Sequence, residues 1–388
     1  MLESSPPMPM IAGPIGLVIL QSTGFCNMDC SYCYLPDRTN SRHIMDLSTV
    51  TEVARLIFTS NLLKRDLDIV WHAGEPLTLA PTYYRNAISI IENARPPGMA
   101  VHYGLQTNGT LISDAWIDLF EEHNIKVGIS LDGPRDLHDR HRKYRSGSGS
   151  YDRVVAGVRK LQARKYPFHF IGVVTAQAIS RAADLIAHYW SFHPTAFGLN
   201  IEELEAQNLH SSLGEDVTTR RFEQFIGELL REGARQDGPS VTIRNFQRTM
   251  SSLISGTPED NDQVMPLRML NVAYNGDIST VSPELLALDA GERRRFIFGN
   301  VHRCNALTDI LKDDRFAAAY REISAGVDRC ARECEYFQYC GGGAPVNKLS
   351  EKGTMDVAET TFCRLTKKAW VNACLQIVDA PGSRFELA

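Results

Sequence analysis

The chain has 388 residues, of which 43% are hydrophobic and 22% charged, and its formal net charge is -5. This length allows two domains, or one large domain with an appendage. The composition is that of a globular protein, and a negative charge without a basic run argues against a nucleic-acid partner. Since no segment approaches the ~18 continuous apolar residues of a membrane helix, we expect no membrane partner.

The start of the chain, "MLESSPPMPMIAGPIGLVIL", ends in an apolar run, but it lacks the basic segment of a secretory signal and carries four prolines. We interpret residues 16–23 as the first buried strand and expect a cytoplasmic protein. Thiols stay reduced in that compartment, so the nine cysteines indicate metal ligation or catalysis rather than disulfides.

Short apolar runs bounded by turn residues alternate with amphipathic segments up to about residue 235. Such alternation predicts parallel strands joined by right-handed helical crossovers, so we expect an α/β fold, a partial (β/α)6 parallel barrel. Ser113 is the expected N-cap of one of the helices. After the first strand, the predicted strands lie within residues 68–76, 101–109, 126–134, 168–175 and 196–203.

The alternation stops after the barrel, and residues 256–264 have the composition of a linker. Beyond it we expect a hairpin at 272–282, turned by Asn275 and Gly276, and a helix near 307–324. The predicted domains are the barrel at 12–237, a linker with a bridging helix at 238–264, and a small loop-rich cysteine-containing domain at 265–388. A domain so poor in regular structure needs a metal to hold it together.

Polar turns follow the predicted barrel strands: "CNMDC", "AGEP", "TNGT" and "SLDGP". The carboxyl ends of parallel strands meet at one face of a barrel, where such folds assemble their sites. We therefore expect these turns to form a single site.

The first turn carries Cys26, Cys30 and Cys33 within eight residues. Thiolates bind soft metals, and four of them close a tetrahedral zinc site. Three thiolates on a cubane [4Fe-4S] cluster leave one iron without a protein ligand, free to bind a substrate. The alternatives are a zinc site completed by a distant residue, or cysteines that are merely buried.

The C-x3-C-x2-C spacing after the first strand, with Tyr32 before the third cysteine, resembles the radical S-adenosylmethionine (SAM) enzymes. The resemblance covers roughly the first two-thirds of the chain. It implies that the open iron chelates SAM, and that an electron cleaves SAM to a 5'-deoxyadenosyl radical that abstracts hydrogen from a substrate.

The later turns imply the SAM contacts of that family. "WHAGEP" resembles its GGEP loop, with Ala73 in place of the first glycine; Glu75 then faces the SAM amino group and Arg142 reaches the carboxylate. His138 and His141 are expected to be exposed rather than ligands. Each turn alone is an ordinary turn. Together they nominate Gly74, Glu75, Gln106, Asn108, Ser130, Asp132 and Arg142, besides Tyr32.

The C-terminal region resembles, in part, the SPASM extension of peptide-modifying radical SAM enzymes, which houses two auxiliary clusters. Here the hairpin lacks its cysteine, and Ala344 stands where another belongs, so the first auxiliary cluster has lost its ligands. The resemblance implies one auxiliary [4Fe-4S] cluster on Cys330, Cys334, Cys340 and Cys363. Cys304 and Cys374 are left for packing; the open alternatives are that Cys304 replaces a ligand, or that the metal is zinc.

Several segments, among them "CGGGAPVNK" and "GLNIEELEAQN", resemble maturases that form cyclophanes in glycine-rich-repeat precursor peptides. That branch joins an aromatic ring carbon to the β-carbon of a nearby residue. The implied partners are a precursor peptide and an external electron donor of the flavodoxin or ferredoxin type. Glu284 is a candidate base for the released proton, although a solvated loop glutamate is the simpler interpretation.

Other functions compete with this one. Thioether formation is an alternative within the same class. Sulfatase maturation is disfavoured because the ligands of its first auxiliary cluster are missing. From other classes, an iron-sulfur electron carrier or a structural zinc protein would bind no SAM.

Overall fold

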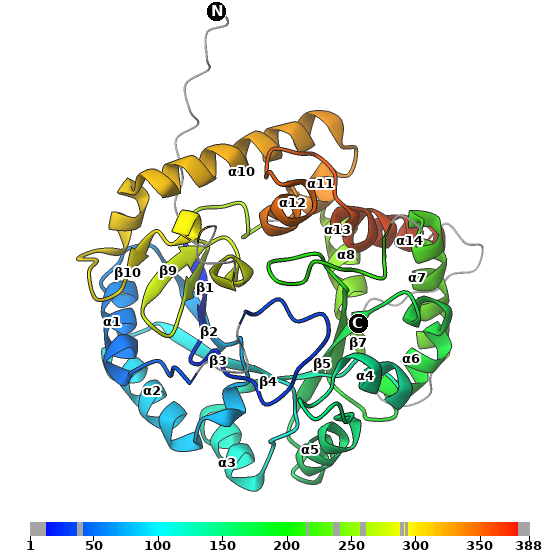
Figure 1. The fold of residues 1–388 in the computed structure, drawn as a ribbon, viewed down its shortest axis with the longest axis horizontal. Coiled ribbons are helices and arrows are strands. Elements are labelled where there is room, and N and C mark those ends of the chain that lie inside the picture. The colour runs from blue at the N-terminus through cyan, green and yellow to red at the C-terminus, as the bar shows by residue number, and fades with distance from the viewer. Residues whose placement is uncertain are drawn as a thin grey trace, which may run out of the picture.

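The structure is a computed structural model that describes residues 13–36, 42–214, 217–235, 241–256, 261–287, 291 and 294–378. Figure 1 shows a ring of strands with helices around the outside and the C-terminal helices along one side. The N-terminal boundary predicted at residue 12 and residues 257–260 of the predicted linker lie outside the described residues.

The six predicted strands are present and lie side by side in chain order, all parallel, which confirms the partial barrel. The first four of them are followed by the polar turns that the sequence places there. The six strands are β1 (Ile15–Leu20), β2 (Leu63–Trp71), β3 (Ala100–Thr107), β4 (Lys126–Ser130), β5 (Phe168–Val174) and β6 (Ala196–Ile201).

The helices of the barrel cover its outer face (Figure 1). In the first of them, Val50, Val53 and Ile57 recur at helical spacing and are buried against the sheet, and Asp46 caps the helix by accepting from the Ser48 amide. Ser113 is an N-cap as predicted, but without a side-chain hydrogen bond. The helices are α1 (Leu47–Phe58), α2 (Pro81–Ala94), α3 (Asp114–His123), α4 (Arg135–His141), α5 (Tyr151–Ala163), α6 (Ala182–Trp190) and α7 (Thr219–Gly233).

A short strand that the sequence pattern does not show follows the barrel helices, and a helix comes after it within residues 238–264, where a bridging helix is predicted. β7 (Thr242–Ile243) pairs in parallel with β6, and α8 (Arg244–Ser255) begins directly after it. Asn245 fixes this junction, because its side chain accepts from the Leu199 amide at 2.8 Å and donates to the Leu199 carbonyl at 2.9 Å.

The predicted hairpin is present as β8 (Met269–Val272) and β9 (Asp277–Thr280), and it joins the barrel rather than standing apart. β8 pairs in parallel with β1, and the short β10 (Gly299–Asn300) pairs with β9. In the part of the chain that the structure describes, the sheet therefore has ten strands in the order β10-β9-β8-β1-β2-β3-β4-β5-β6-β7, with β10 and β7 at its two ends.

The C-terminal region is more helical than the loop-rich domain that the sequence predicts. The helix predicted near 307–324 begins as a 3-10 segment at Leu307–Lys312 and continues to residue 333. α14 packs against α7 and α8, so this region lies on the barrel. The helices are α10 (Asp314–Glu333), α11 (Phe337–Cys340), α12 (Pro345–Lys352), α13 (Thr361–Cys363) and α14 (Ala369–Val378), with a π-helical turn at Arg364–Lys368. The predicted domain boundaries stay a prediction.

Candidate active site

A cavity of about 630 Å³ lies at the carboxyl ends of the barrel strands. The polar turns converge on it, as expected from the strand ends. It also brings in Glu284 from the segment after the hairpin. The predicted residues that line it are Cys26, Cys30, Tyr32, Cys33, Gly74, Glu75, Gln106, Asn108, Ser130, Arg142 and Glu284.

The three-cysteine loop is held by the chain that follows α4. The Asp29 amide donates to the Lys143 carbonyl at 2.8 Å, and the Ser31 amide donates to the His141 carbonyl at 3.0 Å. Arg145 donates to the Cys26 carbonyl. These contacts fix the backbone while the three thiols remain partly exposed toward the cavity.

The GEP turn lies directly against this loop. Gly74 has φ +61°, and a Cβ there would lie 2.4 Å from the Thr23 carbonyl oxygen and 2.7 Å from that of Phe25, so only glycine fits. Ala73, the departure from the family's GG, also has a positive φ of 75°, a conformation that costs an alanine more than a glycine.

Glu75 is buried, and its carboxylate accepts from three groups: the Leu77 amide at 2.9 Å, the Thr107 hydroxyl at 2.6 Å and the Asn108 amide at 2.7 Å. Burial raises the pKa of Glu75 to about 7, although all three hydrogen bonds lower it. A carboxylate in this position is suited to pair with an ammonium group that enters the cavity.

Asp132 is a support for the site rather than part of the cavity wall, which differs from its nomination as a SAM contact. Its carboxylate accepts from the Tyr32 hydroxyl, from Arg142 Nε at 3.0 Å and from the Val173 amide at 2.9 Å. Burial lowers the pKa of Arg142, but Asp132, Tyr32 and Cys30 together raise it by more, so the guanidinium stays charged. Asp132 therefore orients two of the residues that line the cavity.

His138 is fully buried, against the expectation that it is exposed. Its Nδ1 accepts from the Asp132 amide at 3.4 Å, and Nε2 is 2.9 Å from the Ser150 hydroxyl. His141 is partly exposed, and its Nδ1 lies 2.8 Å from the Ser31 hydroxyl. His141 therefore contacts the cysteine loop, and His138 contacts the turn that carries Asp132.

An acidic wall formed by Glu203, Glu205 and Glu284 lines the same cavity. Burial, followed by the neighbouring carboxylates, raises the pKa values of Glu203 and Glu205, and burial also raises that of Glu284. Asn347 donates to Glu203 at 2.8 Å, and Ser282 donates to Glu284.

Sequence reasoning found only Glu284 of this wall. Glu203 and Glu205 follow β6, so the rule that located the other turns, polar residues at the carboxyl ends of strands, would have found them too. His72, at the end of β2, also lines the cavity and was missed; burial lowers its pKa to about 4, and its Nε2 lies 3.0 Å from the Tyr34 hydroxyl.

The cysteines nominated for an auxiliary cluster do not line this cavity. Cys330 lies in the last turn of α10, Cys334 follows that helix, Cys340 ends α11 and Cys363 ends α13. Cys330 lies close enough to Cys334 and Cys340 for their charges to raise its pKa. Lys368 lies close enough to Cys334 and Cys363 for their charges to raise its own pKa.

These four cysteine thiols are ligands of the type that binds an iron-sulfur cluster. In the described part of the chain, no three Cys, His, Asp or Glu side chains surround one metal position; a cube, however, takes one thiolate per iron, so its ligands stand further apart. The glycines 341–343 all have positive φ, and a Cβ on Gly342 would lie 2.8 Å from Val327, so the chain after Cys340 passes close to α10.

Cys304 and Cys374 lie elsewhere. Cys374 is fully buried in α14. Cys304 is partly exposed, and its carbonyl accepts from Arg55 at 2.9 Å. These environments agree with packing roles.

The radical SAM superfamily model matches residues 20–189. An uncharacterized protein of Synechocystis sp. is 36% identical over 91% of this chain and 89% of its own length. The chain belongs to the radical SAM superfamily. It is a radical SAM enzyme, and the [4Fe-4S] cluster and SAM that define the family are its cofactors.

More distant relatives include enzymes and solved structures whose names state an activity or a bound ligand. A cysteine-type anaerobic sulfatase-maturating enzyme of Clostridium perfringens is 24% identical over 95% of this chain and 99% of its own. The solved structure of anSMEcpe with bound AdoMet superposes with a TM-score of 0.76 at 18% identity, covering 93% of this chain and 97% of that one. The structure of Streptococcus suis SuiB bound to precursor peptide SuiA superposes with a TM-score of 0.63 at 15% identity, covering 91% of this chain and 76% of that one. These two structures share the fold.

None of the helices in the described ranges has the length and hydropathy to cross a membrane.

Proposed function

We propose that this enzyme oxidatively modifies a ribosomally synthesised precursor peptide, and that the modification is a C-C cross-link, a cyclophane, between an aromatic side chain and a nearby β-carbon. One observation carries the proposal: the SAM-side residues and the acidic wall share one cavity of about 630 Å³. Hydrogen abstraction and proton removal can therefore act on the same bound peptide. Relatives named as sulfatase-maturating enzymes, and structures of similar fold with bound peptides, support a peptide substrate.

In this proposal Cys26, Cys30 and Cys33 hold the radical cluster, and with SAM it supplies the hydrogen-abstracting 5'-deoxyadenosyl radical. Glu75 binds the SAM ammonium group, and Arg142, oriented by Asp132, binds its carboxylate. Gln106, whose amide donates to the Ser130 hydroxyl at 3.1 Å, and Asn108 contact the rest of the cofactor. These residues fix the reacting carbon of SAM against the substrate and exclude water.

The proposed reaction balances in three steps. A hydrogen atom leaves the substrate β-carbon, and the carbon radical then adds to the aromatic ring. Aromaticity returns when one electron and one proton leave the adduct. The electron needs an acceptor, which we assign to an auxiliary [4Fe-4S] cluster on Cys330, Cys334, Cys340 and Cys363. The proton needs a base, which we assign to the wall.

Glu284 is the member of the wall that we assign as the base. It lines the cavity, and Ser282 donates to its carboxylate. Its pKa is raised by burial, which makes it a better proton acceptor once ionised than an exposed glutamate. Replacement by glutamine retains shape and removes the base, so Glu284→Gln should still cleave SAM but form far less cross-linked peptide. Full retention of cross-linking would remove Glu284 from the mechanism.

Sulfatase maturation is the second candidate, favoured by the names of relatives that cover most of the chain. The absence of a cysteine from the hairpin turn at residues 272–282 opposes it. Thioether formation is an alternative within the main proposal. We further expect a cytoplasmic enzyme that receives its reducing electron from a flavodoxin or ferredoxin.

The test is anaerobic co-expression with the short peptide encoded beside the gene, followed by mass spectrometry. We expect a loss of two hydrogens per link and fragments in which an aromatic residue and its neighbour stay joined. A loss of two hydrogens with all cysteine thiols consumed indicates thioethers. An unmodified peptide, with 5'-deoxyadenosine released only in the presence of a sulfatase-derived peptide, would overturn the proposal in favour of the second candidate.

A further inference from the structure

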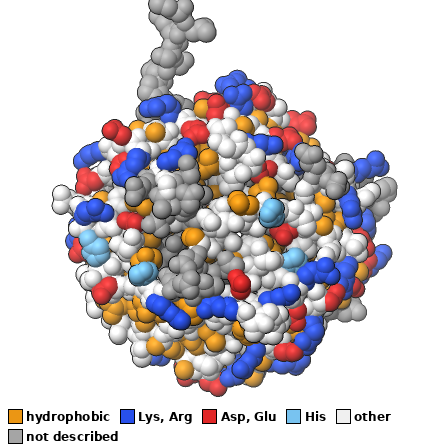
Figure 2. All heavy atoms as spheres, in the orientation of Figure 1, with side chains coloured by type: hydrophobic (Ala, Val, Ile, Leu, Met, Phe, Trp, Pro, Cys, Tyr) orange, Lys and Arg blue, Asp and Glu red, His pale blue; other side chains and the backbone are white. Residues whose placement is uncertain are grey.

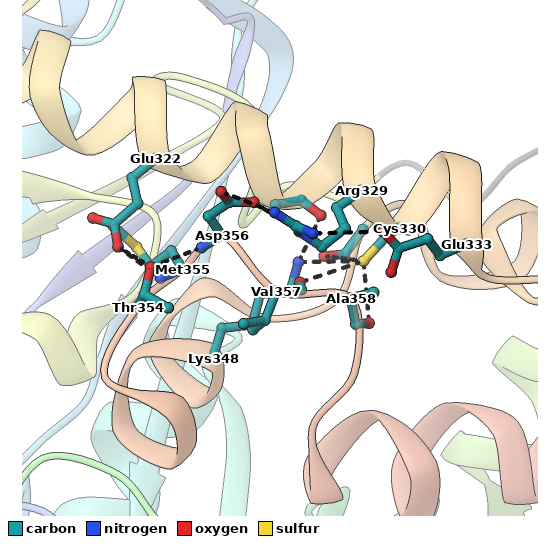
Figure 3. Close-up of polar contacts among 12 residues, drawn as sticks. Glu322, Arg329, Cys330, Glu333, Lys348, Thr354, Met355, Asp356, Val357 and Ala358 are labelled. Carbon is teal, nitrogen blue, oxygen red and sulfur yellow. Dashed lines mark hydrogen bonds and ion pairs between the residues drawn. The ribbon is translucent and has the colours of Figure 1, made fainter.

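Lys348 is a buried lysine that the proposed reaction does not use. It lies in α12, and 4% of its surface is exposed. Lysine is almost never buried to this extent unless its ammonium group is paired. Here Nζ donates to the Gly326 carbonyl at 3.0 Å. It also donates to the Cys330 sulfur at 3.3 Å (Figure 3).

The packing around Lys348 makes room for this contact. A Cβ on Gly326 would lie 3.1 Å from Nζ and 2.0 Å from the Met355 carbonyl oxygen, so glycine is required on that face of α10. The side chain of Lys348 therefore extends from α12 so that its ammonium group lies between α10 and the loop at 354–358.

The loop on the other side is anchored to α10 through residues 354–356 (Figure 3). Glu322 accepts from the Thr354 hydroxyl at 2.7 Å and from the Met355 amide at 2.8 Å. Arg329 pairs with Asp356 at 3.0 Å and 3.3 Å. This anchoring brings backbone carbonyls toward the Cys330 sulfur, that of Ala358 at 3.3 Å and that of Val357 at 3.9 Å.

Carbonyl oxygens are poor neighbours for a sulfur that has lost its proton to a metal. A thiol can donate to one of them, but a thiolate bound to iron can only accept, and the carbonyl dipoles then oppose its negative charge. The Lys348 ammonium offsets this effect, because it brings a hydrogen-bond donor and a positive charge to the same sulfur.

We propose that Lys348 is a positioning residue of the auxiliary cluster, whose ammonium hydrogen bond to the Cys330 sulfur raises the reduction potential of that cluster. The inference rests on the ligands assigned under the proposed function. Hydrogen bonds to cluster sulfurs and nearby positive charge stabilise the reduced, more negative state. Lys348 would therefore favour the transfer of the one electron that leaves the substrate adduct.

The experiment removes the radical cluster, so that only the auxiliary one is measured. In a chain with Cys26→Ala, Cys30→Ala and Cys33→Ala, the midpoint potential is measured by redox titration with electron paramagnetic resonance. Lys348→Met retains the apolar stem and removes the charge. We expect the reduction equilibrium constant to fall about tenfold, which is about 59 mV for one electron. Lys348→Arg, which keeps the charge, should stay near the parent.

Lys352→Met is the matched control, since Lys352 lies in the same helix and is exposed; its potential should equal that of the parent. An unchanged potential in iron-loaded Lys348→Met would overturn the inference. If Lys348→Met assembles no cluster, iron content decides: recovery in Lys348→Arg supports the role of the charge, and no recovery contradicts it. Absence of any cluster in the triple variant itself would overturn the ligand assignment and this inference with it, while leaving SAM cleavage by the intact chain unaffected.

Discussion

The two cysteine groups of this protein differ in how the fold presents their sulfur atoms. Cys26, Cys30 and Cys33 follow β1 and face a large cavity, partly exposed, with their loop held through its backbone. In the C-terminal group, Cys330, Cys340 and Cys363 are buried between helices and the glycine turn. Cys334 is the partly exposed member.

This difference teaches how one ligand type supports two tasks. A cluster that must bind a substrate needs a missing ligand and space beside it, and the barrel mouth provides both. A cluster that only moves electrons is better enclosed, because burial and nearby charge then set its potential. Lys348 is such a charge, and it lies beside the enclosed group.

The largest expected effect separates the two groups by activity. Cys30→Ala should abolish release of 5'-deoxyadenosine under reductant, because two thiolates cannot hold the radical cluster with its open iron in place. Cys340→Ala should still release 5'-deoxyadenosine but yield no modified peptide. Chromatography of the nucleoside and mass spectrometry of the peptide give both readouts.

Cys304→Ser is the control for this comparison, since Cys304 is assigned to neither cluster, and its iron content should equal that of the unmodified enzyme. Loss of nucleoside release in Cys340→Ala, with the radical cluster intact by its spectrum, would show that the two groups do not act separately.

The second prediction concerns the buried pair behind the radical cluster. Asp132 and Arg142 are both buried, with side chains 3% and 11% exposed. Asp132→Asn leaves the guanidinium without its counter-ion, which typically costs about 3 kcal/mol or more of folding stability. We also expect weaker SAM binding, because Arg142 and Tyr32 lose their common partner. Anaerobic denaturant unfolding and equilibrium binding of SAM measure the two effects.

Asp136→Asn is the matched control, because Asp136 also pairs with an arginine, Arg181, but at the surface. Exposed pairs contribute little, so its stability and its SAM affinity should change far less. Equal losses in the two variants would mean that burial of the Asp132 pair has no special role.

Much of the barrel and of the site could be predicted because the signals are local. Each of the six strands carries its own apolar run, and each turn residue follows its strand directly, so one rule about strand ends located Cys26, Glu75 and Asn108 together. Glu203 and Glu205 obey the same rule, but the sequence interpretation used their segment for a strand and a family likeness and not for the site.

The remaining features depend on contacts between distant parts of the chain. β7 has two residues and no periodicity, and the pairing of β8 with β1 joins segments that lie far apart in the sequence. That Asp132 supports the cavity instead of lining it depends on the direction of its side chain, which the LDGP turn does not specify. The burial of His138 likewise depends on α5, whose preceding residue Ser150 contacts it.

The smallest predicted effect tests whether burial of the acidic wall lowers the folding stability of the enzyme. Burial raises the pKa of Glu203 in the folded state above its ordinary value of 4.5, and Glu284 and Glu351 add to the shift. As pH rises above about 4.5, the unfolded chain releases this proton first, so folding stability falls with increasing pH.

Glu203→Gln cannot ionise and can still accept a hydrogen bond from Asn347. Its melting temperature should match that of the unmodified enzyme near pH 4.5 and exceed it by on the order of 2 °C at pH 8, for about 1 kcal/mol. Glu228→Gln, at an exposed position of α7, is the control and should show no such trend. A difference that shrinks as pH rises would mean that Arg248 and Lys367, which line the same cavity, stabilise the ionised carboxylate more than burial opposes it.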